Sequence, residues 1–248
     1  MRSLPLWPYP RHIAHRGGGH FAPENTLAAM RTGKDHGFEM VEFDVKLSAD
    51  DVIFLLHDST LDRTTDGSGA VKSLNYSELI RLDAGSWHSP RYAGEPIASL
   101  RSVARYALAN DIFCNIEIKP SPDTEAETGK AVALAAREYW QGKTVLPLLS
   151  SFSEAALAAA QQAAPEVPRA LLVKDIPLDW RERLAQYQCT AMNINHRNAT
   201  PELIADVHNA GYRIAAWTVN DPERAALLLS WGIDAIFTDE LISISPTA

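Results

Sequence analysis

The chain has 248 residues, 46% of them hydrophobic and 22% charged, a composition that excludes disordered and fibrous proteins and supports one substantial core. Its formal net charge of -8 gives no electrostatic reason to bind a nucleic acid duplex or an anionic membrane surface, so we predict neither partner. Three prolines within residues 1–10 interrupt any signal-like run, and no apolar run reaches the roughly 18 residues of a membrane span, which favours a cytoplasmic protein.

Short apolar runs alternate with helical segments along almost the whole chain. Eight of these runs are typical of buried strands: His12–His15, Met40–Val45, Phe113–Ile118, Val145–Ser150, Arg169–Val173, Ala191–Asn195, Arg213–Thr218 and Ala235–Thr238. The segments between them have helical apolar spacing, as in Asn25–His36 and Thr124–Trp140, and two begin with an N-cap residue followed by proline, at Thr200 and Asp221. This alternation implies βαβ units with right-handed crossovers. We therefore predict an α/β fold, a closed (β/α)8 TIM barrel that residues 1–248 form as a single domain.

One segment departs from this alternation. Val52–Leu56 is strand-like, but only residues 48–51 separate it from the strand before, too few for a crossover helix. We expect an antiparallel hairpin that extends the second strand beyond the barrel rim. The following region, Ser59–Pro96, lacks the barrel pattern, is rich in Asp, Gly, Ser and Thr, and has a helical patch near Tyr76–Leu82. We predict a small insertion at about 59–96, lying over the active-site end and followed by a helix at Leu100–Ala109.

Charged residues occupy positions on two neighbouring barrel strands that point inward. Glu42 and Asp44 are two residues apart and share one face of their strand, and Glu117 and Lys119 do the same on the next barrel strand. A single carboxylate could be explained by a salt bridge with Lys46 or Lys119. Three carboxylates together, without a cluster of sulfur or imidazole ligands, favour a hard divalent ion. We expect Mg²⁺, with Ca²⁺ or Mn²⁺ as alternatives, bound by Glu42, Asp44 and Glu117.

Two histidines follow strands at the end where barrel active sites form, His15 after the first strand and His57 after the hairpin. Imidazole exchanges protons near neutral pH, so both are candidates for general acid and base in phosphodiester hydrolysis. The run Gly17-Gly18-Gly19 after His15 is expected to let the backbone approach a ligand closely. The run does not match the dinucleotide-binding fingerprint.

Two cations lie next to these candidates. Arg16 offers a planar fork and Lys119 a point charge for the non-bridging oxygens of a phosphate. With a metal they would stabilise charge that develops in the transition state. Trp217, near the end of the seventh strand, has two open interpretations: it stacks on a small polyol, or it is a buried barrel residue.

The remaining reactive side chains are expected to be structural. Cys114 and Cys189 lie in apolar, strand-like runs and are predicted to be reduced core thiols. Four other histidines show no companion motif: His12, His36, His88 and His208. No exposed apolar helix face indicates an oligomer.

Six motifs together resemble the glycerophosphodiester phosphodiesterase family, in order and in spacing, from about Ile13 to Asp239. They are His15-Arg16-Gly17, Pro23-Glu24-Asn25-Thr26, Glu42-Phe43-Asp44-Val45, His57-Asp58, Glu117-Ile118-Lys119 and Trp217-Thr218-Val219-Asn220. Each motif is weak alone, but six in series are specific. The chain looks closest to the bacterial cytoplasmic members associated with glycerol 3-phosphate uptake.

The resemblance implies a barrel with an insertion after the His-Asp motif, and it implies a role for each matching residue. Glu42, Asp44 and Glu117 match the metal ligands, His15 and His57 the acid–base pair, and Arg16 and Lys119 the phosphate contacts. The implied reaction is metal-dependent hydrolysis of a glycerophosphodiester, such as glycerophosphocholine or glycerophosphoethanolamine, to sn-glycerol 3-phosphate and an alcohol. The nucleophile is either water or the neighbouring 2-hydroxyl of the glycerol, and either histidine can be the base.

Three other functions compete with this one. A lysophospholipase D-type enzyme on the same barrel needs an apolar entrance, whereas the insertion reads Thr64-Thr65-Asp66-Gly67-Ser68-Gly69, although Trp87 and Tyr92 could contribute to one. A non-catalytic phosphodiester-binding protein is expected to lack one of the acid–base or metal residues, and all are present. A nucleic acid phosphodiesterase is disfavoured by the net charge and by the absence of a basic, aromatic-lined track.

Overall fold

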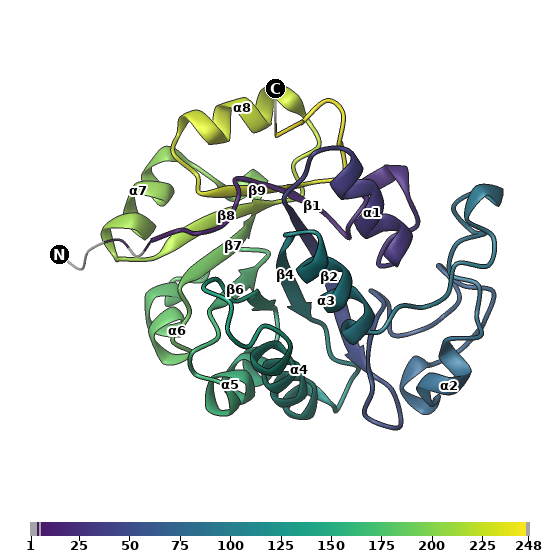
Figure 1. Ribbon diagram of the computed structural model, residues 1–248. Helices are drawn as coiled ribbons and strands as arrows, with labels where there is room; N and C mark the ends of the chain where they lie inside the picture. Colours follow the sequence, from purple (N-terminus) through teal and green to yellow (C-terminus); the bar gives the residue numbers. More distant parts are fainter. Residues whose placement is uncertain (1–3, 5, 247–248) are drawn as a thin grey trace.

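The strands of the computed structural model, which describes residues 4 and 6–246, form one sheet that closes on itself (Figure 1). All pairings are parallel except that of β3 with β2. Closure occurs at β1, where Ala14 pairs with Val41 on β2 and with Thr238 on β9. The strands are β1 (His12–Ala14), β2 (Met40–Leu47), β3 (Ile53–Leu55), β4 (Phe113–Ile118), β5 (Leu148–Ser151), β6 (Arg169–Val173), β7 (Ala191–Asn195), β8 (Arg213–Trp217) and β9 (Ala235–Thr238). The predicted (β/α)8 barrel is confirmed.

Most strand bounds agree with the sequence pattern, and four agree to the residue: β4, β6, β7 and β9. The prediction for β5 was wrong at its start, because the strand begins at Leu148 and not at Val145. Pro147 lies directly before the first ladder pair, Asn115 with Leu148, and has no N–H to donate to a ladder. The predicted hairpin is confirmed, with Val45 to Leu47 paired antiparallel to β3 beyond the barrel rim.

Helices surround the barrel, and five of those in the described chain begin after a residue whose side chain accepts a backbone N–H. They are α1 (Leu27–Asp35), α2 (Tyr76–Leu79), α3 (Leu100–Ala109), α4 (Glu125–Tyr139), α5 (Glu154–Ala163), α6 (Trp180–Gln186), α7 (Pro201–Asn209) and α8 (Pro222–Ser230). Thr200 and Asp221 accept a backbone N–H at the starts of α7 and α8, as predicted. Short 3₁₀ turns lie at Gly19–Phe21, Val71–Ser73, Pro90–Tyr92 and His196–Asn198.

The barrel interior changes from apolar to polar along its axis. Near the N-terminal ends of the strands, Ile13, Met40, Leu148 and Phe237 pack with small alanines. One layer further on, the buried residues include Glu42, Asn115, Ser150 and Asn193. Two larger clusters fill the space between sheet and helices, and Cys114 and Cys189 lie in them as buried, free thiols, in agreement with the prediction. The polar layer faces the end where the strands terminate.

The segment after the hairpin forms its own small core beside β2 and α3, on the right of Figure 1. Phe54, Leu61, Val71 and Leu79 are buried in it. The helical patch predicted at Tyr76–Leu82 is shorter, because α2 ends at Leu79 and the chain continues as turns. The single domain over 1–248 and the insertion limits at about 59–96 stay predictions.

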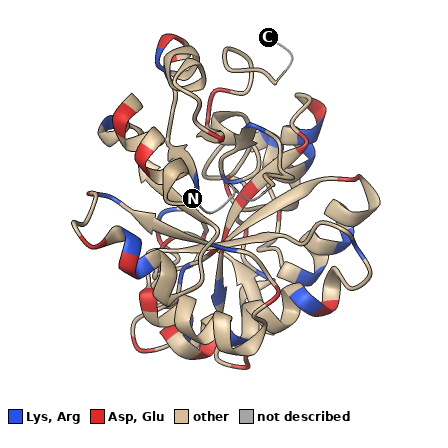
Figure 2. Cartoon of the chain, turned by 90° about the vertical axis from the view of Figure 1, so that its left-hand side faces the viewer, with Lys and Arg blue, Asp and Glu red and all other residues tan. Residues whose placement is uncertain are grey.

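Charges of both signs are spread over the helices around the barrel (Figure 2). Within the described part of the chain, no helix is both long enough and apolar enough to cross a bilayer. The prediction that the chain has no secretory signal depends partly on residues 1–3 and 5, which lie outside the described residues. The cytoplasmic location stays a prediction.

Candidate active site

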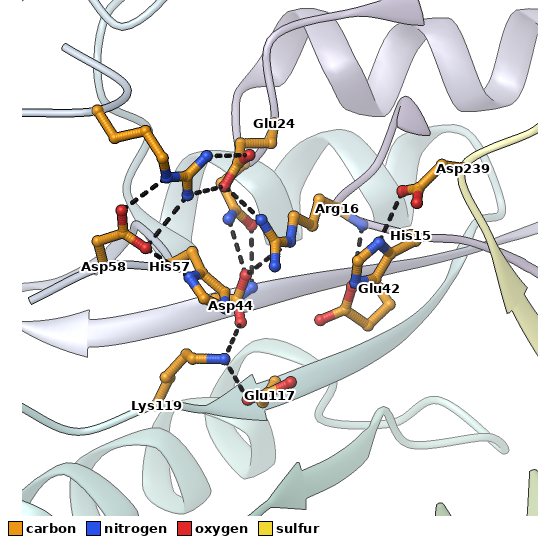
Figure 3. Close-up of polar contacts among 12 residues, drawn as sticks. His15, Arg16, Glu24, Glu42, Asp44, His57, Asp58, Glu117, Lys119 and Asp239 are labelled. Atoms are coloured by element: carbon orange, nitrogen blue, oxygen red, sulfur yellow. Dashed lines mark hydrogen bonds and ion pairs between the residues drawn. The ribbon is translucent and has the colours of Figure 1, made fainter. Parts of the chain in front are cut away.

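All predicted site residues except Trp217 are shown together in Figure 3, at the C-terminal end of the barrel. Strand pairing aligns Asp44 on β2 with Glu117 on β4, and Glu42 lies one inward position below Asp44. One oxygen atom from each of Glu42, Asp44 and Glu117 lies within 4.8 Å of the others. The alternation of the strands therefore brings three carboxylates to one point.

These carboxylates repel one another, and their pKa values show it. Burial raises the pKa of Glu42 to about 8, and the charge of Asp44 adds to the effect. Burial and Asp44 also raise the pKa of Glu117. Burial alone would raise the pKa of Asp44, but Lys119 and Arg16 hold it well below its usual range. Without a bound cation, Glu42 and Glu117 therefore hold their protons more tightly than exposed glutamates do.

One oxygen of this cluster lacks a partner. Glu42 Oε1 is buried and accepts no hydrogen bond from any described residue. Buried polar atoms are rarely left unsatisfied, and an all-oxygen ligand set is the kind that Mg²⁺, Mn²⁺ and Ca²⁺ prefer. The residues present therefore fit a hard divalent cation.

Two lysines lie near the cluster, Lys119 and Lys46, and they make different contacts. Lys119 Nζ lies 3.3 Å from Asp44 Oδ1 and donates to Glu117 Oε1 at 2.9 Å. Lys46 instead donates to the backbone oxygen of Lys119 at 2.8 Å, and makes no ion pair within the described chain. The salt-bridge alternative for the carboxylates thus holds for Lys119 but is wrong for Lys46.

The loop after β1 reaches the cluster through two left-handed residues, Arg16 with φ of 51° and Asn25 with φ of 61°. The Arg16 N–H donates to Glu42 Oε2 at 2.9 Å, and its Nε lies 3.7 Å from Asp44 Oδ2. Asn25 bonds Asp44 twice, donating to Oδ2 and accepting the backbone N–H, both at 2.9 Å. This strained loop therefore holds two of the carboxylates in place.

Within that loop, Gly19 lets the backbone pass close to the segment after β9, and contact of the glycine run with a ligand stays a prediction. Gly19 has φ of 51°, and a Cβ there would overlap the backbone oxygen of Asp239. The next residue, His20, donates its backbone N–H to that same oxygen at 3.1 Å. The close approach is therefore made to the protein's own backbone after β9.

His15 is oriented by that same segment after β9. Its Nδ1 lies 2.7 Å from Asp239 Oδ1, and Asn220 donates to the other Asp239 oxygen at 2.8 Å. Burial would lower the pKa of His15, but the bond to Asp239 and the charge of Glu42 raise it overall. An ionised carboxylate only accepts, so the proton is assigned to Nδ1. The other nitrogen, Nε2, lies 3.8 Å from Glu42 Oε2, beside the cluster.

His57 has a similar arrangement on the opposite side. Its Nδ1 lies 2.6 Å from Asp58 Oδ1, which leaves Nε2 to exchange a proton. Burial lowers the pKa of His57. Arg63 donates to both oxygens of Asp58, at 2.7 and 3.2 Å, and to both oxygens of Glu24, each at 2.8 Å. Glu24 in turn accepts from Arg16 at 2.8 Å. The Arg63 guanidinium thus connects Asp58, which holds His57, with Glu24, which holds Arg16.

Trp217 lies at the edge of this site. Its ring is half-buried on the apolar barrel core and meets Phe152 edge-on, with centroids 5.5 Å apart. Its indole N–H donates to no described residue. Contact with a polyol therefore stays a prediction.

Several residues of the site received no role from the sequence. Glu24, Asn25, Asp58, Asn220 and Asp239 stand in or beside the recognised motifs, and for Asp58 its place next to His57 was the available signal. No sequence pattern indicated a role for Arg63. Its partners Asp58 and Glu24 become neighbours only when the insertion folds back onto the loop after β1.

The fold and site together define an α/β-barrel enzyme with carboxylates, cations and paired imidazoles at the C-terminal end of its strands. The sequence matches the Glycerophosphoryl diester phosphodiesterase family over residues 15–243. The chain belongs to this family and is a glycerophosphodiester phosphodiesterase, which confirms the prediction.

Three of the proteins that this chain resembles match it over nearly their whole length. A glycerophosphodiester phosphodiesterase of Caldanaerobacter subterraneus is 33% identical, over 92% of this chain and 93% of the relative. The structure of an Oleispira antarctica phosphodiesterase in complex with the product sn-glycerol-3-phosphate is 36% identical, with a TM-score of 0.91 over 96% of this chain and 97% of that one. A glycerophosphodiester phosphodiesterase from Agrobacterium tumefaciens is 29% identical, with a TM-score of 0.81 over 94% of this chain and 99% of that one.

Proposed function

We propose that the protein hydrolyses glycerophosphodiesters such as glycerophosphocholine and glycerophosphoethanolamine to sn-glycerol 3-phosphate and an alcohol, in a reaction that requires a divalent metal. The observation that carries the proposal is the convergence of three carboxylates within 4.8 Å of one another, one with an unsatisfied buried oxygen. Two histidines with assigned carboxylate partners flank this point. The product seen in the Oleispira antarctica enzyme supports the product named here.

Glu42, Asp44 and Glu117 would hold the ion. The ligands are all carboxylate oxygens, which suit Mg²⁺, Ca²⁺ and Mn²⁺ alike. We favour Mg²⁺, with Ca²⁺ or Mn²⁺ as alternatives, because free Ca²⁺ is scarce in the cytoplasm, where we expect the protein to lie. When bound, a divalent cation supplies positive charge that polarises a phosphoryl oxygen. Arg16 and Lys119 would add charge from the protein side, since each lies within 4 Å of Asp44.

The two imidazoles would move the protons. Asp239 and Asp58 hold Nδ1 of His15 and His57, so each ring presents Nε2 in a fixed orientation. One Nε2 takes the proton of the nucleophile, and the other gives a proton to the departing alcohol oxygen. Trp217 and Phe152 would shield one side of the substrate from water.

An activity assay tests this proposal. Metal-stripped protein is incubated with glycerophosphocholine, Mg²⁺, Mn²⁺ or Ca²⁺ is added back, and glycerol 3-phosphate is measured with a coupled dehydrogenase. We expect no product without metal and restored activity with at least one ion. Folded protein that forms no product with any ion, or that hydrolyses lysophosphatidylcholine instead, would contradict the proposal.

Arg63 is expected to act as a positioning residue. Lysine at position 63 keeps the positive charge but cannot donate to four carboxylate oxygens at once, so His57 and Arg16 lose a common support. We expect Arg63→Lys to lower kcat by about 10- to 100-fold, in the range of lost outer contacts, with KM changed much less. Arg183→Lys is the matched control, because Arg183 also bridges two carboxylates, Asp179 and Glu154, and neither of them contacts a proposed metal ligand or catalytic histidine. Equal kcat values for Arg63→Lys and the unsubstituted enzyme would refute the positioning role.

A further inference from the structure

A groove of about 330 Å³ opens from the metal-ligand cluster between the ends of β4 and β5. Glu117 and Lys119 line it, so a substituent on a phosphate held by Lys119 can extend into it. Pro120, Phe152 and Glu125, the first residue of α4, also line the groove. Phe152 is 46% exposed, so much of its ring remains available to a ligand.

The polar side chains of this groove have little capacity left for a polyol. The Ser151 hydroxyl donates to Ile118 O at 2.6 Å and accepts the Ser153 N–H at 3.0 Å. The Ser153 hydroxyl caps α5 by accepting the Ala156 N–H at 3.2 Å. Lys119 is engaged by Asp44 and Glu117. The Ser151 hydroxyl is therefore fully used within the protein, and the Ser153 hydroxyl has only its proton left to donate to an alcohol.

Glu125 is the exception. Its carboxylate makes no ion pair or hydrogen bond with any other described residue, although it lines the same groove as Phe152. A carboxylate attracts a cation, and an aromatic face binds alkylammonium groups. Lys119 Nζ already lies 5.9 Å from the Phe152 centroid, within the range of that interaction.

We propose that this groove is the subsite for the alcohol portion of the substrate and that Glu125 and Phe152 select alcohols carrying an ammonium group, such as ethanolamine or choline, over neutral polyols. The inference rests on the proposed function, because it assumes that the phosphodiester is held at the cluster. A neutral glycerol group in the groove leaves the Glu125 charge without a partner and gains no cation–π contact.

Substrate preference tests the subsite. With metal supplied, kcat/KM is measured for glycerophosphocholine, glycerophosphoethanolamine and the neutral glycerophosphoglycerol, on the unsubstituted enzyme and on Glu125→Gln and Phe152→Leu. We expect the ratio of cationic to neutral kcat/KM to fall roughly three- to tenfold in each variant, the effect of a partly exposed ion pair or cation–π contact. Glu127→Gln is the matched control, since it removes the same charge from the same turn of α4, outside the groove.

Two outcomes would overturn the subsite. One is an unchanged ratio in Glu125→Gln and Phe152→Leu while all three substrates are still hydrolysed. The other is an equal fall in Glu127→Gln, which would indicate a general electrostatic effect of α4. A folded unsubstituted enzyme that hydrolyses none of the three would instead overturn the proposed function, and the subsite with it.

Discussion

Replacing His15 with asparagine is expected to lower kcat by about 10²- to 10⁴-fold, the usual contribution of a positioned acid or base, and His57→Asn is expected to do the same. The asparagine amide keeps an N–H donor near the place of Nδ1, so Asp239 or Asp58 retains a partner. It lacks Nε2, the nitrogen that we expect to carry the proton. Steady-state kinetics on glycerophosphocholine, with circular dichroism to check folding, measures the effect.

The chain contains a matched control for this experiment. His208 also pairs with an aspartate, Asp234, at 2.8 Å, but at the end of α7 and directly before β9, at the opposite end of the barrel. We expect His208→Asn to leave kcat within about twofold of the unsubstituted enzyme, because this pair lies at the end of the barrel away from the site, whereas barrel active sites form at the C-terminal ends of the strands. A His15 or His57 variant that keeps a tenth or more of kcat would show that its imidazole is not the acid or base.

Glu42→Gln is expected to abolish metal-dependent activity and, at the same time, to stabilise the metal-free protein. Burial and Asp44 raise the pKa of Glu42 from 4.5 to about 8, so the folded state holds this proton more tightly than the unfolded state does. Ionisation of Glu42 therefore lowers the free energy of unfolding as the pH rises above 4.5, and the full loss is present above pH 8. Glutamine has no such charge, so we expect roughly 2–4 kcal/mol more stability at pH 9 without metal.

Denaturant unfolding at pH 9, in chelator and then with Mg²⁺, measures both parts of this prediction. Metal should stabilise the unsubstituted protein, since an ion that binds only the folded state shifts the equilibrium, and it should leave Glu42→Gln unchanged. Glu127→Gln, on the surface of α4, controls for the loss of one negative charge. A Glu42→Gln protein that is less stable than the unsubstituted one without metal would mean that the three carboxylates do not repel as proposed.

The parts of this structure that could be predicted from sequence depend on local periodicity. Alternation along a strand placed Glu42 and Asp44 on one face, and parallel pairing then aligned Asp44 with Glu117. Proline after a capping residue fixed the starts of α7 and α8. These features need only neighbours in sequence or the regular geometry of a barrel.

The parts that could not be predicted depend on how loops fold over long separations. Arg63 bridges Glu24 and Asp58, and no periodicity relates the insertion to the loop after β1. The left-handed backbone at Arg16, a residue type that rarely adopts it, likewise follows from the contacts around it. Strained positions at a functional site are where local sequence rules fail most often.

We propose that Glu42, Asp44 and Glu117 hold a catalytic divalent ion at the barrel rim. Anomalous diffraction from crystals soaked in Mn²⁺ would locate that ion. We predict one strong manganese peak at this cluster, with oxygen atoms of all three carboxylates at about 2.0–2.6 Å, the range for hard cations. If Mn²⁺ supports hydrolysis in solution but no peak lies between these residues, the claim is contradicted.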